Sequence, residues 1–136
     1  MSQPPISTSD LIHQKCVPCE GGTAPLTNAE EDAYLSAVTP WRIDRTSTHQ
    51  LSREYQFKNF AQVLVAVNRT GQLAEAEGHH PNLYIYQYRH LRIELYTHAI
   101  NGLSINDFIL AVKINKLLGA AWLCLANQNI KNSLIR

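Results

Sequence analysis

The sequence predicts an α+β fold, a four-stranded antiparallel sheet with about three helices packed on one of its faces. Segments that alternate apolar and polar side chains occur in two pairs, and a short polar turn joins each pair, which predicts two hairpins. Segments with helical caps or helical spacing of apolar side chains precede, separate and follow these pairs. The expected order is α-β-β-α-β-β-α, over residues 28–38, 41–45, 51–58, 60–77, 83–88, 91–97 and a last helix after Ser104.

The first helix and the first hairpin have recognisable boundaries. Thr27 or Asn28 can cap the helix, and Pro40 stops it because proline lacks the N–H that the helix needs. In the second strand of the hairpin, Leu51 and Tyr55 fall on one face and polar side chains fall on the other. This alternation predicts a strand that is buried on one side only.

The long helix at 60–77 is bounded by two residues that favour its ends. Asn59 can accept a hydrogen bond from the first turn, and Gly78 can adopt the left-handed conformation that often follows a helix. The second hairpin then follows, with its turn expected near residues 89–90. Two histidines would therefore lie directly between a helix end and a strand.

The last helix begins with a capping-box pattern, because Ser104 is followed three residues later by Asp107. We expect this helix to continue towards residue 127. It carries a broad apolar surface, and the sheet leaves edges that need a cover, so the sequence predicts a homo-oligomer. The apolar residues in question are Phe108, Val112, Leu118 and Trp122.

Composition places the chain among single-domain proteins and excludes several classes of function. Residues 1–24 are rich in Ser, Thr, Pro and Gly and predict an extended arm, and residues 25–136 predict one domain. The net charge is +1 without a basic block, which argues against nucleic-acid binding. The longest apolar run, 117–126, is too short for a membrane span, and no signal peptide is visible, so we expect no membrane association and a cytoplasmic location.

The pair Cys16 and Cys19 forms an isolated C-x-x-C. A structural zinc site needs four ligands, and no second Cys pair or His pair accompanies this one. A glycine pair follows it, where a redox motif of the thioredoxin type would continue into a helix. We therefore expect the two cysteines to be dispensable for chemistry.

The candidate catalytic residues are Glu75, His79, His80 and His98. The first three surround the end of the long helix, and His98 follows the last strand, so the ends of neighbouring elements can bring all four together. Imidazole both accepts and donates protons near neutral pH, which suits general acid–base catalysis. Zinc binding is the alternative, but consecutive residues of extended chain point to opposite sides, so His79 and His80 would not easily share a metal. A purely structural role would make the cluster a coincidence.

These residues resemble the motif of the pterin-4a-carbinolamine dehydratases. That family carries an acid, three residues, His-His-Pro, then an aromatic residue, a histidine and an aspartate at set separations. The matching residues here are Glu75, His79, His80, Pro81, Tyr88, His98 and Asp107. The resemblance covers roughly residues 11–120. Between Pro81 and His98 this chain is one residue longer than many members, which predicts a bulge near 86–87.

The resemblance implies dehydration of 4a-hydroxytetrahydropterin to quinonoid dihydropterin, in recycling of a pterin cofactor for an aromatic-amino-acid hydroxylase. It implies that His79 and His98 are the acid–base pair, that His80 binds substrate and that Glu75 is an electrostatic partner. The pterin is the substrate, and neither a metal nor an organic cofactor is expected. The resemblance also implies that the homo-oligomer is a homodimer or homotetramer. The remaining expected site residues are Pro81 and the backbone of Thr97, Ala99 and Ile100 for binding, Asp107 as support for the helix start, and Trp41, either in the pocket or in the core.

Alternative functions stay open at this point. Animal relatives of the family also act as dimerisation cofactors for a transcription factor, so a partner-binding role on the same fold is one alternative. A pterin-binding protein without dehydratase activity is the other, although the three intact histidines argue against it.

Overall fold

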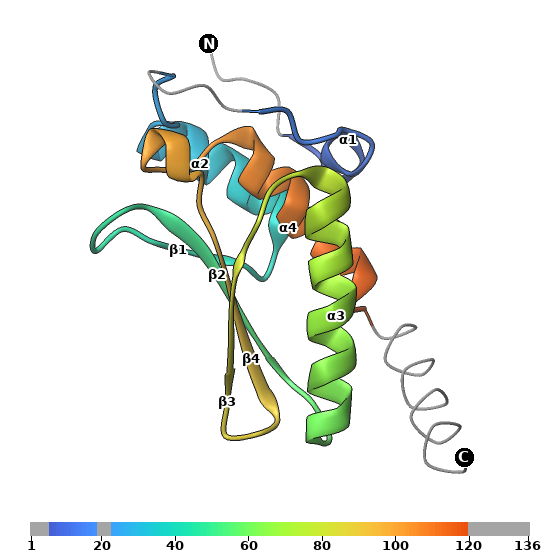
Figure 1. The fold of residues 1–136 in the computed structure, drawn as a ribbon. Coiled ribbons are helices and arrows are strands. Elements are labelled where there is room, and N and C mark those ends of the chain that lie inside the picture. The colour runs from blue at the N-terminus through green and yellow to red at the C-terminus, as the bar shows by residue number, and fades with distance from the viewer. Residues whose placement is uncertain (1–5, 19–22, 120–136) are drawn as a thin grey trace.

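The computed structural model describes residues 6–18 and 23–119. Four antiparallel strands form one sheet in the order β1-β2-β4-β3, and the longer helices lie on one side of it (Figure 1). The predicted α+β class is confirmed. The elements are α1 (Thr8–Ile12), α2 (Asn28–Leu35), the 3-10 turn η1 (Ser36–Val38), β1 (Arg42–Asp44), β2 (Gln50–Gln56), α3 (Phe60–Glu77), β3 (Asn82–Tyr86), β4 (His90–Leu95), the 3-10 turn η2 (His98–Ile100) and α4 (Ile105–Leu117).

The sheet is buried on one face, as the alternation predicts. Leu51 of β2 pairs with Leu95 of β4, and these side chains are fully buried together with Leu91 and Ile93. The neighbouring register positions, such as the pair Ser52 and Glu94, face the other way and stay partly exposed. The apolar face packs against α4, where Phe108–Val112 are all buried.

Helix ends fall where the sequence indicates. The Asn59 side chain accepts a hydrogen bond from the backbone N–H of Gln62 at 2.9 Å, and Gly78 closes α3 with φ of 65°. Ser104 and Asp107 form the expected capping box of α4. The structure describes α4 as far as Leu117, and its expected continuation towards residue 127 lies outside the described residues.

Two local expectations are wrong. Residues 8–12 of the arm form α1 rather than an extended chain, because Ser7 and Asp10 make a capping box and Leu11 is fully buried. No bulge forms in β3, since its pairing with β4 runs uninterrupted to Tyr86, opposite His90. The turn at 87–89 instead includes two residues with positive φ, Gln87 at 46° and Tyr88 at 54°.

The apolar surface expected on α4 is not available to a partner. Phe108, Val112 and Leu118 are 0–3% exposed within the chain itself, because α4 fills the space under the sheet. Trp122 lies outside the described residues. Among the helices of the described part, none is long and apolar enough to cross a membrane.

Candidate active site

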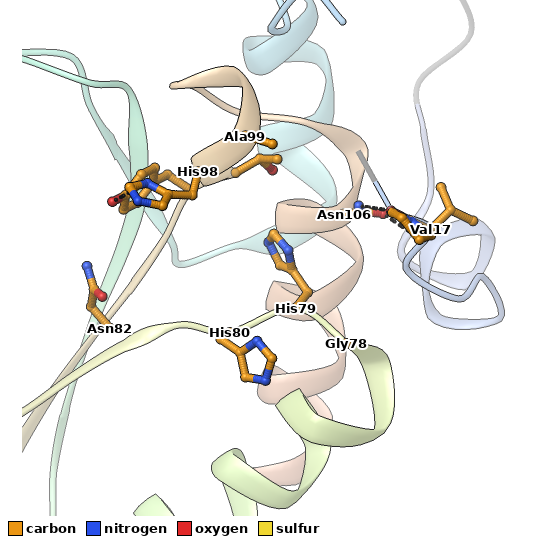
Figure 2. A pocket seen from close by; sticks show the side chains of 11 residues that line it. Val17, Gly78, His79, His80, Asn82, His98, Ala99 and Asn106 are labelled. Carbon is orange, nitrogen blue, oxygen red and sulfur yellow. Dashed lines mark hydrogen bonds between the residues drawn. The ribbon is translucent and has the colours of Figure 1, made fainter. Parts of the chain in front are cut away.

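A cavity of about 540 Å³ lies where the end of α3, the start of β3, the end of β4 and the start of α4 meet (Figure 2). Five of the residues that the sequence singles out line it: His79, His80, Thr97, His98 and Ala99. The volume lies within the range of about 300–1,000 Å³ that is usual for small-molecule sites.

Local chain geometry places the histidines. Gly78 adopts a left-handed conformation that residues with a Cβ rarely take, and this turns the chain out of α3. The backbone N–H of His79 then bonds the carbonyl of Ala74 at 3.2 Å, which holds the first residue after the turn. At the other side, Thr97 and Gly102 pair across a tight loop, and His98 lies inside that loop. Both histidines are therefore on short, hydrogen-bonded connections rather than on long loops.

His79 is bound to a buried carboxylate. Its Nε2 lies 2.6 Å from Oδ1 of Asp107, which is fully buried, whereas the His79 side chain keeps 12% exposure. The other carboxylate oxygen, Oδ2, accepts from Thr97 Oγ1 at 2.8 Å and from the backbone N–H of Ser104 at 2.9 Å. Oδ2 accepts both of these hydrogen bonds; we assign Oδ1 as an acceptor as well, so that Nε2 of His79 carries the proton of this contact.

This arrangement fixes the chemistry that His79 can offer. With Nε2 donating to Asp107, the Nδ1 of neutral His79 is an unprotonated acceptor. It can take a proton there, and the Asp107 carboxylate stabilises the imidazolium that results. Sequence reasoning treats Asp107 as support for the helix start; the structure shows that it does this and also holds His79.

His80 and Glu75 form a second, solvent-exposed pair. His80 Nε2 lies 2.6 Å from Glu75 Oε1, and the two side chains are 64% and 77% exposed. Glu75 does not line the main cavity; with Pro81 and part of His80 it borders a neighbouring open hollow between α3 and β3. Exposed ion pairs contribute little energy, so this pair orients His80 more than it stabilises the fold.

His98 lies in the cavity wall apart from the other two histidines, and Figure 2 shows it and His79 rising from different elements. The Tyr96 hydroxyl is 3.2 Å from Nδ1 of His98, and the two rings meet edge to face with centroids 5.5 Å apart. This contact orients the imidazole and occupies one ring nitrogen, which leaves Nε2 for a ligand.

Two expected site residues lie elsewhere. Trp41 belongs to the core at 3% exposure, and its indole N–H donates to Asn115 Oδ1 at 2.6 Å. Ile100 ends the η2 turn beside the cavity but does not line it.

Sequence reasoning missed several residues of the cavity wall. They are Val17, Pro18, Gly78, Asn82, Tyr96 and Asn106. Gly78, Asn82, Tyr96 and Asn106 adjoin expected site residues in the chain, so adjacency could have indicated them. Val17 and Pro18 reach the cavity only through tertiary packing, for which a single sequence carries no signal.

Within residues 6–18 and 23–119, no group of three His, Cys, Asp or Glu side chains is arranged to hold a metal ion. Cys16 is buried, and burial raises the pKa of its thiol to about 12, with the nearby Glu77 charge acting in the same direction. The thiol is therefore protonated at neutral pH and is a poor nucleophile or metal ligand. Cys19 lies outside the described residues.

Known proteins resemble the chain over most of its length. The family model for pterin 4 alpha carbinolamine dehydratase matches residues 24–117. A protein of Alkaliphilus metalliredigens called "Putative pterin-4-alpha-carbinolamine dehydratase" is 42% identical over 109 residues, which are 79% of this chain and 96% of that one. The mitochondrial pterin-4-alpha-carbinolamine dehydratase 2 of Arabidopsis thaliana is 40% identical over 82% of this chain and 60% of its own.

A solved structure shares the fold. The transcriptional coactivator/pterin dehydratase from Brucella melitensis superposes with a TM-score of 0.64 at 27% identity, covering 70% of this chain and 99% of that one. The sheet and helices that surround the cavity are therefore a known arrangement.

Proposed function

Because the chain belongs to the pterin-4a-carbinolamine dehydratase family, we propose that it dehydrates 4a-hydroxytetrahydropterin to quinonoid dihydropterin. The observation that carries the proposal is the cavity that presents His79, held by the buried Asp107, together with His98 from a separate element. The proposal extends to recycling of a pterin cofactor for an aromatic-amino-acid hydroxylase and to a cytoplasmic location.

The reaction needs two proton transfers on one small molecule. Carbon 4a of the substrate bears a hydroxyl group, and the adjacent N5 bears a hydrogen. Water leaves when the hydroxyl oxygen gains a proton and the C–O bond breaks, and the C4a=N5 double bond forms as N5 loses its proton. The hydroxyl oxygen gains one proton and N5 loses one, so the enzyme needs one acid and one base. Its net charge after the reaction equals its net charge before it.

His79 and His98 fit these two roles. Nδ1 of His79 is an acceptor because Nε2 is held by Asp107, and His98 offers its Nε2 from another part of the wall. Positioned groups of this kind typically contribute about 10²–10⁴-fold in rate. His80, oriented by Glu75, would contact the substrate at the open side of the cavity.

The flat amide edge of a pterin would be bound by backbone. Thr97 and Ala99 line the cavity, so the backbone of this short loop borders the space that the pterin would occupy. Thr97 is held by Asp107 through its hydroxyl, so the position of this loop is coupled to that of His79. Substrate binding by this loop and proton transfer by His79 would then both depend on the hydrogen bonds of Asp107.

The proposal includes no metal and no organic cofactor, and activity that persists after exhaustive chelation would support that part. It also includes a homodimer or homotetramer. Support comes from α3 and the edge strand β3, where large apolar side chains remain 39–47% exposed: Phe60, Leu64, Tyr84 and Ile85. Light scattering that shows only a species near 15.3 kDa would refute the oligomer.

Stopped-flow decay of the 4a-carbinolamine, with and without the protein, tests the activity. His79→Ala and His98→Ala should each lower kcat by roughly 10-fold or more, and the double variant should lose far more. His13→Ala, an exposed histidine outside the cavity, is the control and should match the parent. A double variant with parental turnover would show that other groups move the protons.

A further inference from the structure

The arm before the domain is docked against the active-site cavity. Val17 and Pro18 line the cavity, although they come from a part of the chain about 60 residues before His79. The carboxamide of Asn106 makes two hydrogen bonds to one arm residue: Oδ1 accepts from the Val17 N–H at 3.0 Å, and Nδ2 donates to the Val17 carbonyl (Figure 2). A side chain here replaces the two bonds that a neighbouring strand would make.

A second attachment lies one residue earlier. The Cys16 backbone N–H donates to Oε2 of Glu77 at 3.0 Å, and the other oxygen of Glu77 is paired with Lys113. Burial alone would raise the pKa of Glu77, but the hydrogen bonds from Lys113 and Cys16 outweigh it and the net pKa is lowered. The arm is thus tied both to the last turn of α3 and to α4.

The chain is fixed again where it enters the domain. The Leu26 N–H bonds the Leu103 carbonyl at 2.9 Å. Pro25 packs so closely on Gly102 that a Cβ there would lie 2.7 Å from the proline ring. Gly102 closes the loop that carries His98, so described residues on both sides of 19–22 are attached to elements that form the cavity.

Packing alone gives little reason for Val17 and Pro18 to be held in place. Val17 is 60% exposed and Pro18 is also exposed, whereas Cys16 next to them is 8% exposed. The bonds from Asn106 therefore hold two residues whose surfaces remain open, and those residues form part of the cavity wall.

We propose that the docked arm is a wall of the substrate-binding site, and that Asn106 is a positioning residue that acts on substrate affinity by holding Val17 and Pro18 in place. This inference rests on the proposed function for the identity of the ligand. An arm that detaches part of the time would lower the apparent affinity in proportion to the fraction of molecules with a complete wall. The proton-transfer groups, by contrast, would remain in position.

The test is a double-variant cycle with Asn106→Ala and Pro18→Ala. Affinity is measured by calorimetric titration with 7,8-dihydrobiopterin, a reduced pterin without the 4a-hydroxyl group, and kcat and KM are measured by stopped flow. Asn106→Ala should raise Kd and KM by roughly 5- to 10-fold and change kcat much less, because loss of binding appears in KM. Pro18→Ala should give a smaller rise.

The effects of the two substitutions on Kd and KM should not be additive in free energy. Once Asn106 no longer holds the arm, removal of the proline ring should have little further effect, so the double variant should resemble Asn106→Ala. Asn115→Ala is the matched control, since Asn115 lies on the same helix and its side chain also ties down another segment, through the Thr39 carbonyl, outside the cavity. It should lower the urea midpoint without raising Kd.

The outcomes separate the two proposals. If the parent binds 7,8-dihydrobiopterin and dehydrates the carbinolamine, but Asn106→Ala keeps parental Kd and KM, the arm is not a wall of the site and the proposed function stands. Multiplicative effects of the two changes would also overturn the role of Asn106 as the residue that positions Pro18. If the parent neither binds nor dehydrates, the proposed function fails, and this inference fails with it.

Discussion

Replacing Asp107 by Asn is the sharpest test of how the site works, because it changes one oxygen to an NH2 group within nearly the same volume. Asp107 is fully buried and accepts from three donors, His79 Nε2, Thr97 Oγ1 and the Ser104 N–H. An asparagine carboxamide has one oxygen that accepts and one NH2 group that donates. The hydrogen bonds made by one of the two carboxylate oxygens must therefore reverse or be lost.

Two orientations of the new carboxamide are possible, and the structure favours one. If the NH2 group faced Ser104, it would meet a backbone N–H, a donor that cannot rotate away. If it faces His79, the imidazole can carry its proton on Nδ1 instead of Nε2, so that Nε2 accepts from the NH2 group. The second orientation leaves no opposed donors, so we expect a folded protein in which His79 has the wrong tautomer.

The expected cost falls on catalysis more than on stability. Neutral His79 would present N–H to the cavity and could not accept a proton, so kcat should fall by about 10²-fold or more. All three hydrogen bonds are kept but none is now made to a carboxylate, and the one to His79 is reversed, which costs about 1–3 kcal/mol of unfolding free energy. Stopped-flow dehydration measures the first effect and urea unfolding the second.

A matched control separates the tautomer from the loss of a buried charge. Glu31 is also fully buried, and its Oε2 lies 2.8 Å from Nδ1 of His49, away from the cavity. Glu31→Gln should lower stability and leave kcat near that of the parent. Imidazole ¹⁵N shifts should show His79 changing its protonated nitrogen in Asp107→Asn. A folded Asp107→Asn protein with kcat within about threefold of the parent would refute this account of His79.

Three further predictions concern the surroundings of the site. Replacing Cys16 and Cys19 by Ser should leave kcat nearly unchanged, since the Cys16 N–H still bonds Glu77 and a serine hydroxyl can donate where the thiol donates, to the Asn106 carbonyl; a severe loss in a folded protein would contradict it. His80→Ala should chiefly raise KM, and an equal fall in kcat and kcat/KM would argue against a binding role. The pKa of Glu77 is lowered in the folded chain, so its charge stabilises the fold fully above the unfolded pKa, and this stabilisation is lost as pH falls through the folded pKa. The difference in unfolding free energy between the parent and Glu77→Gln, measured with urea, should therefore shrink in acid. A difference that stays constant with pH would exclude this linkage.

Local sequence signals account for the elements that position the site. Asn59, Gly78 and Ser104 were identifiable because a cap acts on backbone groups two or three residues away, and the structure uses all three. The helix at residues 8–12 was missed although its capping box is equally local. The surrounding Ser, Thr and Pro residues indicated loop, and burial of Leu11 overrode that composition.

Partners distant in the sequence were beyond such reasoning. Sequence proximity suggested that Glu75 would serve the catalytic histidines, but it pairs with the exposed His80. The partner of His79 is Asp107, 28 residues away. The capping pattern of α4 already accounted for an acidic residue at this position, so there was no reason in the sequence to assign it a second role. A residue that satisfies one local rule gives no sign that it also makes a tertiary contact.

The first turn of α4 explains why this compact chain can place its site accurately. Ser104 caps the helix, and its hydroxyl is hydrogen-bonded to that of Thr97. Asn106 is hydrogen-bonded to Val17 of the arm, and Asp107 is hydrogen-bonded to both Thr97 and His79. These three residues lie within one helical turn, and the helix that carries them is buried in the core, so its position is fixed by packing rather than by the site. Because Ser104 and Asp107 serve both the helix start and the cavity, the forces that fold α4 also set the geometry of the proposed catalytic groups, and disturbance of that turn should reduce activity before it unfolds the protein.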